Sequence, residues 1–85
     1  MDLSTIPEHM REGVRGYIEH GGKPGSFLNA ILCNNLVCAA RFADDINKRF
    51  LFQWALLLYN DIPRPAWGDQ ETVNKWIAHR GKENV

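Results

Sequence analysis

The 85-residue sequence lacks an excess of charge of either sign, because ten lysine and arginine residues balance ten aspartate and glutamate residues. Proteins that are held to DNA or RNA by bulk charge usually carry a basic excess on one face, and adhesion to anionic membranes depends on the same excess. The charge balance therefore disfavours a nucleic-acid partner and a membrane-surface partner.

Segments that enter or cross a membrane are also missing. The longest apolar run, Phe50 to Tyr59 with Gln53 as its one polar residue, is about half of the ~20 residues that a membrane span requires. Residues 1–13 show no basic stretch followed by an apolar one, which is the pattern of a secretory signal. We therefore expect a cytoplasmic protein with no membrane partner.

Cysteine is scarce, and Cys33 and Cys38 are the only two. Five residues apart on one helix, they would point in different directions and could not form a disulfide. Their spacing is not that of a C-x-x-C redox motif. We interpret them as reduced, buried, small apolar residues, in keeping with a cytoplasmic protein.

Alternating patterns typical of β-strands are absent, and the segments between glycine and proline residues have a helical period. An apolar content of 45% is too high for a disordered chain. The sequence predicts an all-α, compact domain over residues 1–85, with four to five helices and a frayed tail from about residue 82. The expected helices cover about 5–20, 27–33, 36–43, 44–60 and 70–80.

Glycine residues punctuate the first predicted helix. Gly21 and Gly22 should end it, one of them in the left-handed conformation. Gly13 and Gly16 are unusual inside a helix, and their spacing would let another helix approach closely. In the same way, Gly81 is expected to end the last helix.

The segment over about 44–60 is the expected central helix, with Asp44 or Asp45 as its N-cap. At about 100° per residue, Phe52, Leu56 and Tyr59 lie nearly opposite the broad face that we expect in the core. That core face consists of Ile46, Phe50, Leu51, Trp54, Leu57 and Leu58. A helix that is apolar almost all round is usually buried on both sides, whereas an uncovered stripe would mark a partner site. Both interpretations stay open.

A rigid, proline-flanked loop follows this helix and carries Arg64 and Trp67. These residue types often anchor protein interfaces. The alternative for Trp67 is that it folds back onto the last helix, which Asp69 should cap. The candidate partner-interface residues are Phe52, Leu56, Tyr59, Arg64 and Trp67.

No combination of residues in the sequence predicts a catalytic site, a cofactor site or a metal site. His9, His20 and His79 lack the i, i+4 spacing of a helical zinc pair, and the stretch GGKPGS lacks the spacing of a phosphate-binding loop. Neither cysteine has a cationic neighbour that would activate a nucleophile. We therefore expect no enzyme, no catalytic residue, no cofactor and no metal.

Residues 26–50 also admit a helix-turn-helix interpretation, in which Arg41, Lys48 and Arg49 would contact phosphates. A nucleic-acid-binding protein could use Arg11 and Arg15 in addition. The helix that would read the bases, over about 36–43, is mostly apolar, whereas such helices present polar side chains to base edges. We instead expect its apolar residues to point inward at least in part, namely Leu36, Val37, Ala40 and Phe42. A nucleic-acid-binding protein remains an alternative.

Three sequence motifs resemble those of short helical proteins encoded by tailed bacteriophages and prophages. The motifs are a Pro-Gly-x-Phe-Leu turn, a Leu-Tyr-Asn segment and a Trp-Gly-x₄-Val-x-x-Trp-Ile ending. They match Pro24, Gly25, Phe27 and Leu28; Leu58, Tyr59 and Asn60; and Trp67, Gly68, Val73, Trp76 and Ile77. The sequence departs from the pattern at Gly22–Lys23 and at Asp69.

The resemblance implies a phage-encoded accessory protein that acts in a bacterial cytoplasm. We expect it to bind and modulate a bacterial host protein through an apolar and aromatic helical surface. A homodimer, in addition to that role or as a purely structural one, stays open.

Overall fold

Within residues 2–83, six α-helices and one short 3₁₀ helix pack around a single apolar core. The structure is a computed structural model that describes the backbone of residues 2–83 and the side chains of residues 2–81. The helices are α1 (Glu8–His20), α2 (Ser26–Leu32), α3 (Leu36–Phe42), α4 (Asp45–Arg49), α5 (Leu51–Asn60), η1 (Arg64–Ala66) and α6 (Gln70–Glu83). Residues 2–83 contain no β-strand, so the all-α prediction is confirmed. None of these helices has the length and apolar content that a membrane span needs.

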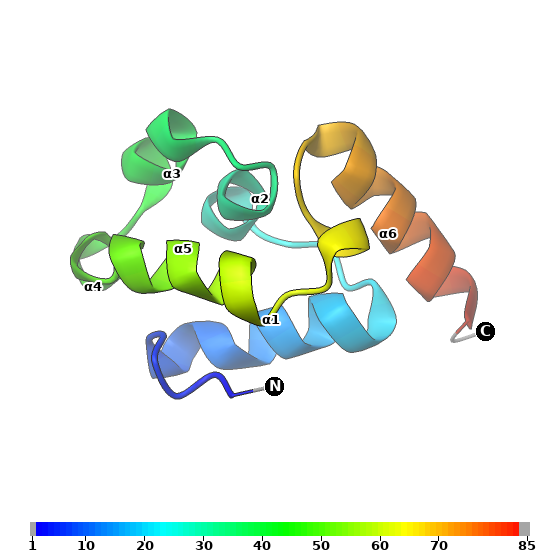
Figure 1. Cartoon of the computed structure of the whole chain (residues 1–85), viewed down its shortest axis with the longest axis horizontal. Coiled ribbons are helices and arrows are strands. Elements are labelled where there is room, and N and C mark those ends of the chain that lie inside the picture. Colours follow the sequence, from blue (N-terminus) through cyan, green and yellow to red (C-terminus); the bar gives the residue numbers. More distant parts are fainter. Residues whose placement is uncertain (1, 84–85) are drawn as a thin grey trace.

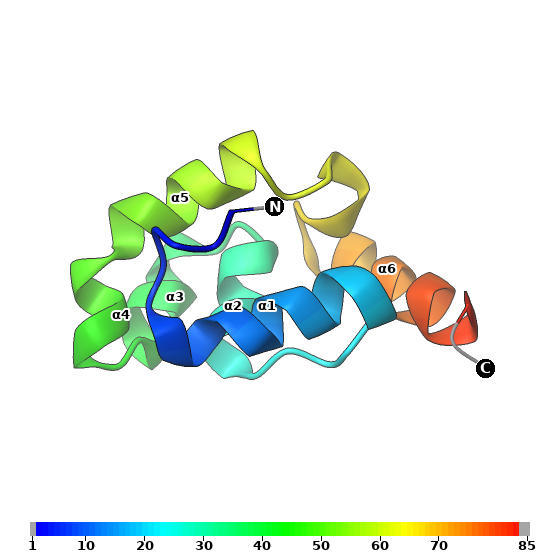
Figure 2. The ribbon, with the colours of Figure 1, turned by 90° about the horizontal axis from the view of Figure 1, so that it is seen from below.

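The helices lie in a molecule of 36 × 24 × 20 Å (Figure 1). Helices α2 and α3 pack as a pair, and α6 packs against both α1 and α2. In Figure 2, α5 lies along one side of the molecule and α1 along the other, with α4 at one end between them. Helix α5 therefore has the rest of the fold on its inner side only.

Aromatic residues from four helices meet in the core. Trp54 of α5 is fully buried, and its ring meets that of Phe27 edge-on, with 5.4 Å between the ring centroids. The Tyr17 hydroxyl donates to the Ala66 carbonyl oxygen over 2.6 Å, and Trp76 Nε1 donates to the Tyr17 carbonyl oxygen over 2.9 Å. Burial raises the pKa of Tyr17, so this hydroxyl stays protonated and remains a donor. These contacts fix α1, η1 and α6 to one another.

The predicted single helix over 44–60 is wrong in one respect, because the chain breaks at Phe50 into α4 and α5. Phe50 has φ −109° and ψ 15°, outside regular α-helical geometry. Across the break, the buried Asn47 side chain accepts a hydrogen bond of 3.3 Å from Trp54 Nε1. With this break, the described part of the chain contains six α-helices in place of the predicted four to five.

This break also decides which residues of the segment reach the core. Trp54, Leu57 and Leu58 are buried as predicted, and Phe50 and Leu51 are half-buried. Ile46 is half exposed, so its predicted place in the core is wrong. The periodicity that placed it there assumed one continuous helix, and α4 does not continue the helical phase of α5.

The sequence predicted that glycines would end the first and the last helix, and this is correct for α1 but wrong for α6. Gly21 ends α1 in the left-handed conformation with φ 68°, as expected. Gly81 does not end α6, because the helix continues to Glu83. A single glycine costs a helix only about 1 kcal/mol relative to alanine, which packing against α1 and α2 offsets. Of the predicted tail, residues 84 and 85 lie outside the described residues.

Two aspartates cap helices as predicted. Asp44 Oδ1 accepts from the Asn47 backbone N–H at the start of α4, and Asp69 Oδ1 accepts from the Thr72 N–H at the start of α6, each over 2.7 Å. These backbone donors hold the pKa of both carboxyl groups below the ordinary value of 3.8. Each carboxylate therefore stabilises the folded state only while it is ionised.

We expect the free energy of unfolding to fall as the pH drops below about 4, because the folded-state pKa values lie below those of the unfolded chain. The contribution is present above the unfolded pKa and is lost as the pH falls through the folded pKa. Asparagine caps a helix without titrating, so the double variant Asp44→Asn, Asp69→Asn should show a shallower decline. Urea denaturation from neutral pH into the acid range measures this, and identical slopes for both proteins would contradict it.

Candidate interaction surface

The outer side of α5 is left uncovered by the other helices. Phe52 is 69% exposed, Leu56 42% and Tyr59 83%, although all three are large apolar or aromatic side chains. The interpretation in which neighbouring helices wrap this segment on all sides is therefore wrong for the described residues. The structure places these three predicted residues together, on consecutive turns of one helix face.

Helix α3 adds two exposed residues that the sequence analysis placed inside. Leu36 is 71% and Val37 79% exposed, and Ala40 is exposed as well, so those expectations are wrong. Phe42 is 47% exposed, so its predicted place inside is wrong as well. The reason is that α3 has seven residues and meets α2 through the buried Ala39. A helix this short buries one side only, and its first turn faces solvent.

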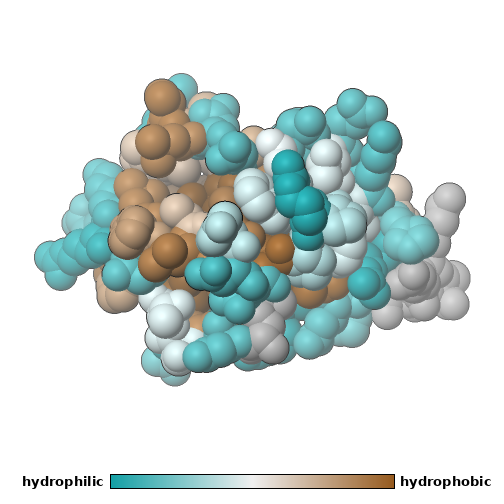
Figure 3. Space-filling model, in the orientation of Figure 1, coloured by the Kyte–Doolittle hydropathy of each residue, from teal (hydrophilic) through white to brown (hydrophobic). Residues whose placement is uncertain are grey.

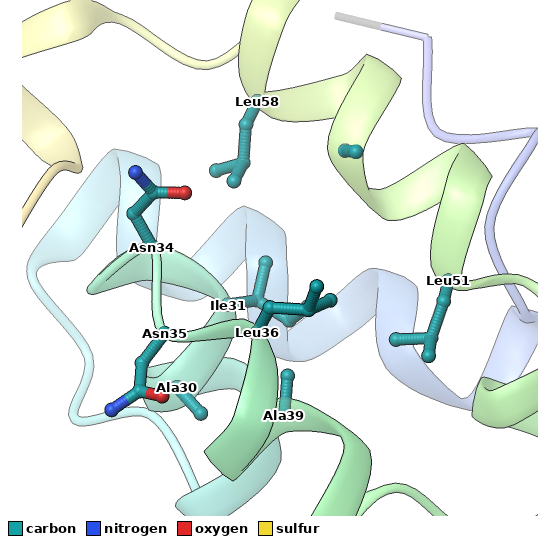
Figure 4. A pocket seen from close by; sticks show the side chains of 9 residues that line it. Ala30, Ile31, Asn34, Asn35, Leu36, Ala39, Leu51 and Leu58 are labelled. Atoms are coloured by element: carbon teal, nitrogen blue, oxygen red, sulfur yellow. The ribbon is translucent and has the colours of Figure 1, made fainter.

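A hollow of about 60 Å³ lies between α2, α3 and α5 (Figure 4). None of the residues that line it carries a charge, and the two asparagines are its only polar side chains. Its lining consists of Ala30, Ile31, Asn34, Asn35, Leu36, Ala39, Leu51, Ala55 and Leu58.

The hollow and the exposed stripe of α5 are continuous. At about 100° per residue, Ala55 lies between the hollow-lining Leu51 and Leu58 on one side and Phe52 and Tyr59 on the other. Figure 3 shows apolar surface gathered over this side of the molecule. We call the hollow, together with Leu36, Val37, Phe52, Ala55, Leu56 and Tyr59, the α3–α5 face.

Arg64 and Trp67, the other two predicted interface residues, contact each other. The Arg64 guanidinium lies 4.3 Å from the Trp67 ring centroid and also donates to the Trp67 carbonyl oxygen. Trp67 is half-buried against the core, and the next residue, Gly68, donates its N–H to the Leu32 carbonyl oxygen over 2.7 Å. This pair therefore anchors the loop before α6, and the geometry gives it a structural task apart from the α3–α5 face.

Two of the five residues of the nucleic-acid alternative, Arg11 and Arg41, make contacts within the fold. Arg11 donates to the carbonyl oxygens of Leu3, Ser4 and Ile6, which fixes the segment before α1. Arg41 stacks 5.4 Å from the Phe42 ring centroid. Helix α3 exposes Leu36 and Val37 where a base-reading helix would present polar side chains.

Histidine and cysteine residues make local contacts. His9 Nε2 lies 3.0 Å from Asp44 Oδ2 in an exposed pair that joins α1 to α4. Cys33 Sγ donates to Gln70 Oε1 over 3.4 Å, and burial raises the pKa of this thiol. Both cysteines are half-buried, so the expectation of full burial is wrong. Among the described residues, no group of three His, Cys, Asp or Glu side chains could hold a metal ion.

Comparison with known proteins finds no relative from which a function could be transferred. No protein-family model matches this chain, and neither a curated protein nor a solved structure matches it. The phage resemblance stays a prediction.

Proposed function

We propose that this protein is a phage-type accessory protein that binds a bacterial host protein in the cytoplasm through the α3–α5 face and thereby modulates it. One observation carries the proposal: Phe52, Leu56 and Tyr59 are exposed on one stripe of α5, and this stripe adjoins, through Ala55, an uncharged hollow that the exposed Leu36 also lines. Single exposed apolar residues are common on protein surfaces, but a contiguous patch of this kind typically marks an interaction site.

The composition of the face matches the centre of a protein interface. Such centres are depleted in charged residues and enriched in aromatic ones, and tyrosine is among the residue types that dominate binding energies. Helix α5 has no charged residue, and it exposes both Phe52 and Tyr59. The hollow beside Ala55 offers a concave site that an apolar side chain of the partner could fill.

Leu56→Asp and Tyr59→Asp should each weaken partner capture by at least about 30-fold, the equivalent of the ~2 kcal/mol that marks a dominant interface residue. Either substitution puts a carboxylate into the apolar centre, where it would have to lose its hydration without gaining a counter-ion. The measurement is affinity purification from bacterial lysate, followed by titration of the recovered protein against each variant.

Ala78→Asp is the matched control, because it places the same carboxylate on the exposed side of α6. It should capture the partner as well as the wild type does. Circular dichroism first establishes that each variant is folded. Equal recovery of the same protein by wild type, Leu56→Asp and Tyr59→Asp would show that the face is not the binding surface.

A further inference from the structure

We infer that the free protein forms a two-fold symmetric homodimer, in which the α3–α5 face of one copy packs against the same face of a second copy. The two α5 helices run antiparallel, with Leu56 next to the symmetry axis. This inference rests on the proposed function in one respect, since both assign protein binding to the same face. It goes further by naming what covers that face when no host protein is bound.

The exposed area is of the size that a dimer needs. Given that large aromatic side chains bury about 150–250 Å² each, the five exposed residues offer on the order of 600 Å² of apolar surface. A standard stable interface buries about 800 Å² per partner. The other apolar side chains that line the hollow add little, because most of them are buried, so the exposed residues by themselves reach the lower end of that size class, about 600 Å² per partner.

The spacing of the stripe makes it self-complementary. Phe52 and Tyr59 lie four residues before and three residues after Leu56, so an antiparallel copy brings Phe52 of each chain opposite Tyr59 of the other. Leu56 then meets its own equivalent at the axis. Ala55 is exposed and small, which lets the two helix backbones approach closely between the aromatic pairs. Such an isologous contact is the commonest form of homo-oligomer.

Charge favours a second copy over a charged partner. A two-fold contact places each charge of the face near its own equivalent, which is repulsive. Helix α5 carries no charge, α3 carries only Arg41, and the whole chain is balanced. A strongly acidic or basic partner would find no complementary charge at this face, whereas a second copy finds a matching apolar one.

Molar mass in solution is the first test. Light scattering at micromolar to millimolar concentration should give twice the 9.7 kDa mass of one chain, and Leu56→Asp should give the mass of a single chain. Ala78→Asp should remain dimeric. A monomeric wild type overturns the inference, and so does a dimer that Leu56→Asp leaves intact, because that dimer would use another surface.

Disulfide trapping with copper-phenanthroline tests the antiparallel arrangement, in a background where Cys33 and Cys38 are replaced by serine. Leu56→Cys should form a covalent dimer across the axis. Phe52→Cys alone should not, because two equivalent Phe52 positions would lie about 12 Å apart at 1.5 Å rise per residue. A mixture of Phe52→Cys and Tyr59→Cys chains should cross-link, while Glu12→Cys on α1 should not. Cross-linking of Phe52→Cys with itself, or none at Leu56→Cys, overturns the arrangement.

Failure of this inference can be told apart from failure of the proposed function. A monomer that still captures a host protein through Leu56 and Tyr59 would overturn the homodimer and leave the function standing. A dimer that captures no host protein would overturn the proposed function and leave the homodimer standing. If the protein both forms the dimer and binds a host protein, the two partners compete for the α3–α5 face. The apparent affinity for the host protein should then fall as the concentration of this chain rises.

Discussion

Replacing Trp54 with alanine is expected to remove about 3–5 kcal/mol from the free energy of unfolding, the range measured for large aromatic residues in protein cores. Trp54 has no exposed surface and packs edge-on against Phe27. A domain of this length has a total stability on the order of 4–13 kcal/mol. The substitution therefore removes a large part of the free energy of unfolding, and the variant should be close to unfolding at ambient temperature.

Part of that loss comes from one hydrogen bond. Trp54 Nε1 donates to the side chain of Asn47, which is only 2% exposed, so removal of the indole leaves a buried acceptor without its partner. An unsatisfied buried polar group costs about 1–3 kcal/mol. Trp54→Phe keeps most of the apolar contact and should show this smaller loss alone. Its effect should shrink when Asn47→Ala is already present, as a double-mutant cycle would reveal.

Urea denaturation followed by circular dichroism measures both effects as shifts of the midpoint at constant slope. Tyr59→Ala is the control, because it changes an aromatic residue on the opposite, exposed face of the same helix. Both substitutions are compared in the Leu56→Asp background, because Tyr59 lies in the inferred dimer contact. Tyr59→Ala should alter the unfolding free energy of the monomer by less than about 1 kcal/mol. Similar midpoints for Trp54→Ala and Tyr59→Ala would refute the assignment of inner and outer faces to α5.

The sequence predicted the core face of α5 because hydrophobic period is a local property, and Trp54, Leu57 and Leu58 obey it. It did not predict the break at Phe50. That break depends on which side of α4 is turned inward, and Asn47 meets Trp54 only once both helices are packed. Ile46 was misplaced for the same reason. Local periodicity does not reveal a residue such as Asn47, because its role depends on a contact between two separate helices.

The candidate face was half predicted. Phe52, Leu56 and Tyr59 stood out because they lie nearly opposite the core face of the helix, although periodicity left open whether other helices would cover them. Leu36 and Val37 were missed, although the same reasoning applies to them: α3 is short and apolar nearly all round, and packing leaves it one inner side. Arg64 and Trp67 were chosen for their residue types, and type alone did not reveal that they stack on each other.

Gly21→Ala should destabilise the protein, whereas Gly13→Ala should stabilise it. Gly21 has φ 68°, a conformation that costs other residues about 1–2 kcal/mol. A Cβ there would also lie 2.8 Å from the Ile77 carbonyl oxygen and 2.9 Å from the Gly81 nitrogen, which belong to the backbone of α6. Since backbone atoms cannot turn aside as a side chain can, the loss should exceed the conformational cost and α1 should separate from α6.

Gly13 gives the opposite result because a Cβ at this position meets nothing within 4 Å, and the same holds for Gly16. The sequence-based expectation that these two glycines admit a neighbouring helix is therefore wrong. Alanine in a helix interior is favoured over glycine by about 0.5–1 kcal/mol, so Gly13→Ala should raise the melting temperature by several degrees. Thermal melts of the two variants beside the wild type measure both shifts. A melting temperature of Gly21→Ala at or above that of the wild type would contradict the role of this turn in joining α1 to α6, and a lowered one for Gly13→Ala would contradict the open space at that position.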